Sequence, residues 1–338
     1  MKSLKTSLAL PPSRQLSRRG ALKTLGGLGL VAAAGIAPQP ARAQAAATTL
    51  NEAGFYRFTV GDYRLTAISD GTLTFPASFY GVNAGDDEVS QVLARHHLPA
   101  ETVTNQSICL LIDTGQNLVL IDTGFGPFAV PGAPPTAGKL LATLETLGVD
   151  PRDVDTVILT HGHPDHVGAN VDAEGRATFP NARYVMQRLD WDYWTERARS
   201  ENPADQEDFS VQVARVNLLP IADRTEWIEG GVEIVAGIRA VEAFGHTPGH
   251  MALAITSGGE QLLHIADAAG HFLIALEHPE WYGGYDLDPD RAMAVRLLLL
   301  DRAAADGVRV FGYHFPFPGL GFVVEEARED NWRWTPTS

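Results

Sequence analysis

The sequence predicts one mixed α/β domain over residues 44–338. Stretches with the alternating apolar and polar residues of strands are interspersed with stretches that carry helix signals. A hairpin pattern whose second strand ends in an aspartate occurs twice, over 108–124 and over 251–270, which suggests a duplicated unit. No linker rich in Pro, Gly or Ser interrupts residues 50–338, so a single domain is the simplest count.

Local patterns predict the individual elements. Residues 55–75 alternate apolar and polar side chains around two turns, as paired strands do. Helices are expected over 84–100, 136–147, 187–199, 203–217 and 289–305. The last has the clearest ends, because Asp288 and Pro289 fit its N-cap and first position and Gly307 stops it.

The first 43 residues are predicted to be a twin-arginine export signal. Arg18 and Arg19 precede a 13-residue apolar run, Leu25–Ala37, which is too short to span a bilayer. Ala41-Arg42-Ala43 then offers a cleavage site with small residues at its two ends. The expected location is therefore periplasmic or secreted. A disordered basic N-terminus is the alternative.

Charge excludes some classes of partner. The net charge of the whole chain is −15, and removal of the signal leaves 19 Lys/Arg against 41 Asp/Glu, a charge of −22. Such a chain is a poor partner for nucleic acid or an anionic membrane surface. Its single cysteine, Cys109, lies in an apolar run and is expected in the core, since it cannot form an internal disulfide.

The strongest functional signal is the stretch Val154–Asn170. An apolar run ends at Thr160, and four residues of metal-ligating type follow within six positions: His161, His163, Asp165 and His166. Imidazole and carboxylate suit zinc and related divalent metals. A His-rich surface turn is the alternative. The metal interpretation is favoured because α/β proteins build their sites just after strands.

Three further candidates follow apolar runs in the same way: His246, Asp267 and His314. If these strands share a sheet edge, the side chains converge there. Spacing alone leaves the choice between His246 and His250 open, because both flank the tight turn of GHTPGH. Asp267 as a turn cap and His314 as a core residue are the competing interpretations.

The HGHPDH run resembles the H-x-H-x-D-H signature of the metallo-β-lactamase superfamily. AFGHTPGH, IAD and YHFPFPG resemble its remaining ligand motifs, in the usual order, and the resemblance extends from about Phe55 onward. Within the superfamily, GDYRLTAISDGT, VLIDTG, HTPGH and a final His before FPFPG are most similar to the methyl parathion hydrolase-like group, which includes lactonases.

The resemblance implies an αββα sandwich built from two similar halves, with a site for two divalent metal ions. Zinc is the first choice, with manganese, iron and cobalt as alternatives. It implies that one metal is held by His161, His163 and His246, the other by Asp165, His166 and His314, and that Asp267 bridges both. It also selects His246 over His250, and gives Asp122 the role of orienting a ligand histidine.

Departures from other subfamilies narrow the implied chemistry. No cysteine lies between His246 and His314, where β-lactamases with a cysteine ligand carry one. Flavodiiron oxygen reductases would have glutamate at the place of His163, and the C-terminal extension of glyoxalase II relatives is not identifiable. These differences favour the hydrolases with a bridging carboxylate.

The expected function is therefore metal-dependent hydrolysis of an ester, lactone or organophosphate triester by a bridging hydroxide, with Asp165 as the catalytic residue that aligns it. A β-lactamase and a non-catalytic exported metal-binding protein are the alternatives. Aromatic residues near Phe125, Trp191, Phe272 and Trp281 either line the pocket or fill the core. If they line it, the substrate is a small apolar ester-like molecule. Similar proteins are often homodimers, so a homodimer is one expected assembly.

Overall fold

The structure is a computed structural model that describes residues 54–85, 87–126, 137–326 and 331–337. The predicted export signal lies outside these residues, as do Thr136 and Phe128. The described residues lie together in one compact unit. Within the described ranges, none of the helices combines the length and the apolar character that crossing a membrane requires.

Seven strands form the first sheet, in the order in which they occur in the chain. They are β1 (Phe55–Val60), β2 (Tyr63–Pro76), β3 (Thr102–Asp113), β4 (Leu118–Ile121), β5 (Thr156–Ile158), β6 (Arg183–Gln187) and β7 (Thr225–Ile228). The strands from β1 to β4 pair antiparallel, whereas those from β4 to β7 pair parallel. The sheet is therefore mixed.

The second sheet also has seven strands, in the order β14-β13-β12-β11-β10-β9-β8. They are β8 (Glu233–Val235), β9 (Ile238–Glu242), β10 (Met251–Ser257), β11 (Glu260–Ala266), β12 (Arg309–Gly312), β13 (Leu320–Glu325) and β14 (Trp332–Pro336). Each half thus contains an antiparallel hairpin whose second strand pairs parallel with the next strand: β3–β4 with β5, and β10–β11 with β12. This repeat matches the duplicated unit predicted from the sequence.

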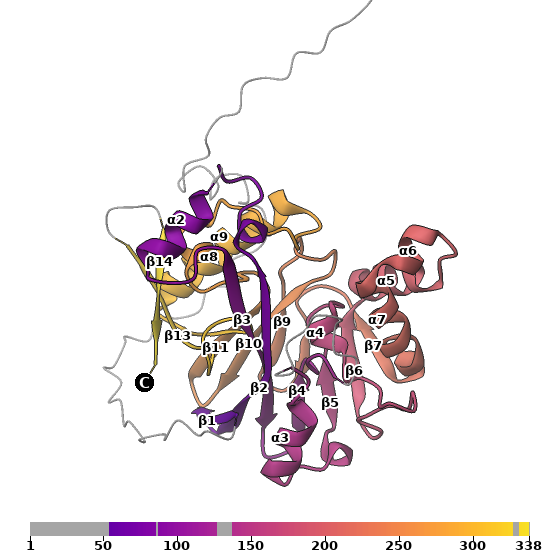
Figure 1. Cartoon of the computed structure of the whole chain (residues 1–338). Helices are drawn as coiled ribbons and strands as arrows, with labels where there is room; N and C mark the ends of the chain where they lie inside the picture. Colours follow the sequence, from indigo (N-terminus) through magenta and orange to yellow (C-terminus); the bar gives the residue numbers. More distant parts are fainter. Residues whose placement is uncertain (1–53, 86, 127–136, 327–330, 338) are drawn as a thin grey trace, which may run out of the picture. The chain divides into compact units, whose positions relative to one another are not determined.

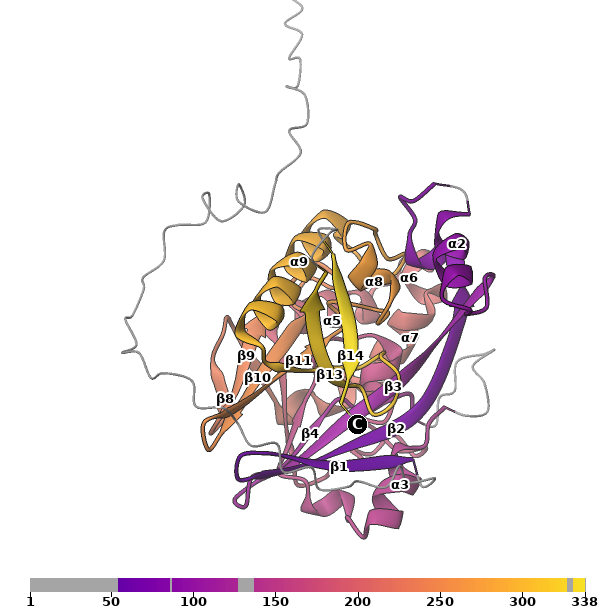
Figure 2. The same cartoon turned by 90° about the vertical axis from the view of Figure 1, so that its left-hand side faces the viewer.

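The buried side chains of β3 show how the layers are stacked. Ile108, Leu110 and Ile112 pack between the two sheets, whereas Cys109 and Leu111 pack against helices on the outer side. This alternation follows from the two-residue period of a strand. Helices α3 (Leu140–Leu147), α5 (Arg188–Arg199) and α7 (Phe209–Asn217) cover the outer face of the first sheet, and α8 (Ile274–Glu277) and α9 (Pro289–Asp306) cover the second (Figures 1 and 2). The domain is the αββα sandwich that the resemblance implied.

The helix predictions are largely confirmed, with two differences. Helix α3 begins at Leu140 rather than after Thr136, and its N-cap residue is Lys139. Helix α2 (Glu88–Arg95) lies within the predicted 84–100, and α9 is capped by Asp288, whose side chain accepts a hydrogen bond from the Arg291 N–H. The single helix predicted over 203–217 is wrong. Asp208 interrupts it between α6 (Pro203–Glu207) and α7, because its carboxylate caps α7 by accepting from the Ser210 and Val211 N–H groups.

Candidate metal centre

The candidate ligands lie just beyond the ends of four strands. His161 and His163 follow β5, and His163 is the N-cap residue of the short helix α4 (Pro164–Val167), which carries Asp165 and His166. His246 follows β9, Asp267 directly follows β11, and His314 lies two residues beyond β12. Strands of both sheets therefore deliver side chains to one place.

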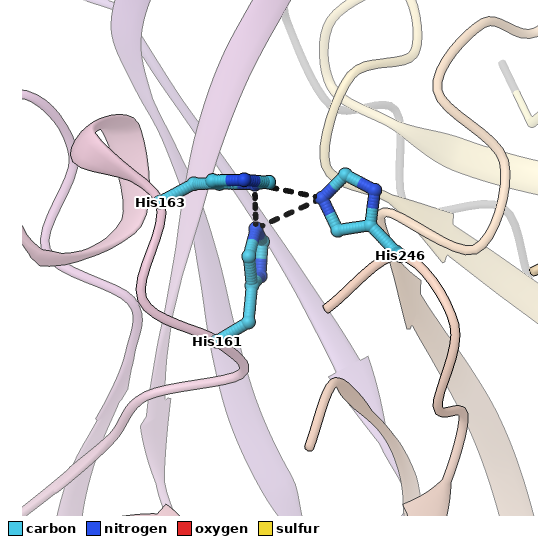
Figure 3. A group of neighbouring side chains, drawn as sticks. All are labelled: His161, His163 and His246. Atoms are coloured by element: carbon cyan, nitrogen blue, oxygen red, sulfur yellow. Dashed lines mark hydrogen bonds between the residues drawn. The ribbon is translucent and has the colours of Figure 1, made fainter. Parts of the chain in front are cut away.

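Three histidines converge in the first group (Figure 3). His161 Nε2 lies 3.0 Å from His163 Nδ1 and 3.2 Å from His246 Nε2, and the latter two atoms are 2.9 Å apart. A neutral ring nitrogen either donates or accepts, so among three mutually close nitrogens at least one pair must be mismatched. A shared cation removes this conflict, because all three can then offer lone pairs. The geometry fits a metal ion.

The second group consists of Asp165, His166 and His314. Asp165 Oδ2 lies 3.5 Å from both His166 Nε2 and His314 Nε2. His166 Nε2 is buried and makes no hydrogen bond to any of the described residues. A buried polar atom left in this way is costly unless something else pairs with it. This group too has the donor set and the geometry of a metal site.

Asp267 stands between the two groups. Its Oδ2 lies 3.4 Å from His246 Nε2 and 3.0 Å from His314 Nε2, and its Oδ1 lies 3.3 Å from His166 Nε2. One carboxylate thus faces histidines of both groups. This is the position that a bridging ligand needs.

The outer nitrogens of the histidines are held by acceptors. His166 Nδ1 donates to Asp122 Oδ2 at 2.9 Å, and His314 Nδ1 donates to the Gln106 carbonyl oxygen at 2.7 Å. When such a ring is neutral and carries its proton on Nδ1, Nε2 presents its lone pair to the centre of the site. Asp122 therefore has the geometry for the orienting role that the resemblance implied.

His250 has both ring nitrogens engaged by the backbone. Its Nδ1 donates to the Ala243 carbonyl oxygen at 2.8 Å, and its Nε2 accepts from the Asp267 N–H at 3.0 Å. His250 is therefore not free to coordinate, whereas His246 Nε2 points into the first group. Of the two histidines that spacing left open, His246 therefore faces the first group, whereas His250 accepts from the Asp267 N–H.

Two aspartates of the site lie in no motif and were missed. Asp286 Oδ1 accepts from His246 Nδ1 at 3.0 Å, and its other oxygen pairs with the buried Arg296 at 3.2 Å. Asp190 accepts from the Gly162 and Gly249 N–H groups, both at 2.9 Å, and from the Thr247 hydroxyl. It therefore ties the loop of His161 and His163 to the loop of His246.

Electrostatics differ between the two groups. Burial, aided by the neighbouring histidines, lowers the pKa of His161 and His163 well below the ordinary value, so both rings are neutral and able to ligate. Burial also opposes protonation of His166 and His314, but the carboxylates of Asp267 and Asp165 outweigh it and raise the pKa of both. The negative field that attracts these protons would equally attract a divalent cation.

The site lies in a cavity of about 520 Å³ with mainly apolar walls. The apolar lining consists of Leu73, Phe75, Phe79, Phe125, Trp194, Phe209 and Leu287. Of the aromatic residues for which the sequence left pocket and core open, Phe125 and Trp194 line the cavity. Trp191 and Trp281 do not line the cavity and belong to buried clusters of the core.

Known proteins resemble the chain in sequence and structure. The model of the metallo-β-lactamase superfamily matches residues 102–314. An N-acyl homoserine lactonase of Bacillus sp is 26% identical over 172 residues, which cover 46% of this chain and 61% of that protein. An N-acyl homoserine lactonase of Bacillus cereus is 24% identical over 193 residues, which cover 53% of this chain and 69% of that protein. The chain thus matches about three fifths of the first relative.

Among solved structures, AidC, a dizinc quorum-quenching lactonase, has a TM-score of 0.75 at 27% identity, covering 84% of this chain and 98% of that chain. The hydrolase AbOPH also gives 0.75 at 27% identity, covering 85% and 99%. The matched family range contains every candidate ligand, from His161 to His314. The chain belongs to the metallo-β-lactamase superfamily.

Proposed function

We propose that this protein is a dinuclear metal-dependent hydrolase that opens lactones, using a site made of the two groups described above. The observation that carries the proposal is the position of Asp267, which lines a mainly apolar cavity and whose carboxylate faces histidines of both groups. Similarity to a lactonase described as dizinc supports zinc as the metal.

The contacts between these residues suggest which of them would hold each of two metal ions. His161, His163 and His246 would hold one ion, Asp165, His166 and His314 the other, and Asp267 both. The ions would supply a hydroxide at neutral pH and polarise the carbonyl under attack. Asp165 lines the cavity as well as facing His166 and His314. It would orient the attacking oxygen by accepting its hydrogen bond.

The cavity supports a neutral, apolar substrate. Its volume lies within the range of small-molecule sites, and its walls are largely aromatic and aliphatic. The lining cation, Arg197, is already engaged by Asp205 and Asp208, at 2.7 and 2.9 Å, so it offers no free clamp for an anion. N-acyl homoserine lactonases among the relatives favour a lactone over other esters. Aryl esters and organophosphate triesters are secondary candidates.

A substrate panel tests the proposal. Purified enzyme with measured metal content would be assayed on N-acyl homoserine lactones, aryl esters, a paraoxon-type triester and nitrocefin, with comparison by kcat/KM. We expect two metal equivalents and the highest kcat/KM on a lactone. Preference for nitrocefin would identify a β-lactamase instead. Two bound metals with no turnover of any substrate would favour the non-catalytic metal-binding alternative.

We also propose export by the twin-arginine route, on the basis of Arg18, Arg19 and the apolar run that follows. The test is fractionation of cells that express the full chain. The wild type is expected in the periplasm or medium, and the double substitution of Arg18→Lys and Arg19→Lys is expected to retain it in the cytoplasm. A wild-type protein found only in the cytosol would contradict the proposal.

A further inference from the structure

The cavity that Asp267 lines also has a buried amide in its wall, that of Asn105 on β3. Its Nδ2 lies 2.6 Å from the Gly270 carbonyl oxygen and 3.0 Å from the hydroxyl of Tyr80, at the end of the 3₁₀ helix η1 (Ala77–Tyr80). Since a carbonyl oxygen only accepts, the contact with Gly270 identifies the amide atom as nitrogen. Asn105 therefore donates to both partners.

This arrangement fixes the role of the Tyr80 oxygen. Because that oxygen accepts from Asn105, its own proton must point in another direction. In the described part of the chain, the Tyr80 hydroxyl has no second hydrogen-bond partner. Tyr80, Asn105 and Gly270 all line the cavity, together with Asp165, Asp267 and His314. The available direction for a partner is the substrate space.

The orientation of the amide satisfies its two N–H groups and leaves its oxygen unpaired within the described ranges. Asn105 is only 5% exposed, and its Oδ1 has no partner among the described residues. A buried carbonyl oxygen without a donor costs free energy. The oxygen of Asn105 stays unpaired, while its two N–H bonds point at Gly270 and Tyr80.

The same strand and loop also connect this pair to the metal ligands. Gln106, the neighbour of Asn105, accepts from His314 through its backbone carbonyl, and Gly270 lies three residues after Asp267. The ring of Tyr285 packs against Tyr80 at 5.8 Å and 72°. Its hydroxyl lies where a side chain of residue 270 would be, 2.1 Å from an added Cβ. Tyr80 is thus held from two sides.

We propose that Tyr80 donates a hydrogen bond to the carbonyl oxygen of the bound substrate, and that Asn105 is the positioning residue that aims it. The proposal rests on the proposed hydrolase function and adds a donor from this chain's own side chains. No proton is transferred. The hydrogen bond strengthens as negative charge develops on the oxygen during attack, so it lowers the barrier of that step. Burial, followed by the charges of Asp165 and Asp267, raises the pKa of Tyr80, which keeps the phenol protonated at neutral pH.

The test is Tyr80→Phe, prepared as metal-loaded enzyme and assayed on N-hexanoyl homoserine lactone. We expect kcat/KM to fall about 10- to 100-fold, mostly through kcat, because a donor to the developing charge is lost. Binding of the ring-opened product, N-hexanoyl-L-homoserine, measured by calorimetry, should weaken about tenfold. Metal content and Tm should stay close to those of the wild type.

Tyr63→Phe is the matched control, since its hydroxyl donates to the Ala236 carbonyl oxygen outside the cavity. It should stay within about twofold of the wild type. A Tyr80→Phe enzyme that equals the wild type on an active lactone overturns this inference alone. The inference is also overturned if Tyr80→Phe loses activity only together with its metal, or if Tyr285→Phe loses activity while Tyr80→Phe does not. A wild type that opens no lactone and cleaves no ester overturns the proposed function together with it.

Discussion

Asp286 Oδ1 accepts a hydrogen bond from His246 Nδ1 at 3.0 Å, across 40 residues of sequence. The other oxygen of the same carboxylate pairs with Arg296, which is 2% exposed and also donates to the carbonyl groups of Ala268, Pro279 and Trp281. The carboxylate therefore orients a candidate ligand and neutralises a buried cation. A charge that is satisfied on both sides is well suited to holding an imidazole in one orientation.

Asp286→Asn is expected to weaken metal binding about 10- to 100-fold, because the amide is a poorer acceptor for the His246 proton. Metal affinity would be measured by competition with a chromogenic chelator. Asp301→Asn, on the exposed face of α9, is the matched control and should bind metal like the wild type. Equal affinities in the two variants would remove Asp286 from the site.

Asp267→Asn should remove the carboxylate that faces both groups and would hold both ions. The amide carries one oxygen and no charge, so it cannot serve both groups, and a drop to about one metal equivalent or fewer is expected. The kcat/KM on the best lactone should fall by at least about 10³-fold, since in the proposed function both ions would supply the nucleophile and polarise the carbonyl. Elemental analysis and kinetics on the same preparation provide the check. Two retained equivalents with full activity would refute the bridging role.

As the pH falls, the two groups are expected to lose their metal ions one after the other. A metal ion must displace protons from its histidines, and the raised pKa of His166 and His314 makes their protons compete over a wider pH range. The lowered pKa of His161 and His163 removes that competition. As the pH falls, the group of Asp165, His166 and His314 is expected to lose its ion first. Dialysis against buffers from about pH 8 to pH 5, followed by metal analysis, should show two losses; a single joint loss would contradict the ordering.

Asp190→Ala should destabilise the protein and loosen the two loops that it joins. The Gly162 and Gly249 N–H groups and the Thr247 hydroxyl would lose their acceptor, at a cost of about 1–3 kcal/mol for each group that stays buried and unpaired. Urea unfolding would measure the change in the free energy of unfolding. Asp192→Ala, in the same helix but on its exposed side, should change it by less than about 0.5 kcal/mol.

Sequence patterns predicted the candidate ligands because each follows the end of an apolar run. Strand ends gather at sheet edges, so local patterns for His161, His246 and His314 carried information about distant contacts. Asp190 and Asp286 have no such signal. Asp190 lies in a helix and Asp286 in a loop, both of ordinary composition. The groups that donate to Asp190 are 28 to 59 residues away, and His246, which donates to Asp286, is 40 residues away.

The remaining errors have local causes. The break at Asp208 was missed because an aspartate inside a helical pattern is tolerated, and only its capping of the Ser210 and Val211 N–H groups turns it into a boundary. Trp191 and Trp194 lie one helical turn apart, yet Trp194 lines the cavity and Trp191 does not. The sequence contains no information on where the cavity begins along that helix.

The candidate ligands are divided unequally between the two halves of the fold. His161, His163, Asp165 and His166 come from the first half, whereas His246, Asp267 and His314 come from the second. Neither half contains a full set for either ion, so bound metals would join the halves as cross-links do. In a chain whose one cysteine is buried and unpaired, they would take the place of a disulfide. Without them, the halves would be joined by their shared apolar interior and by hydrogen bonds such as those from Thr247 to Asp190 and from Asn105 to Gly270.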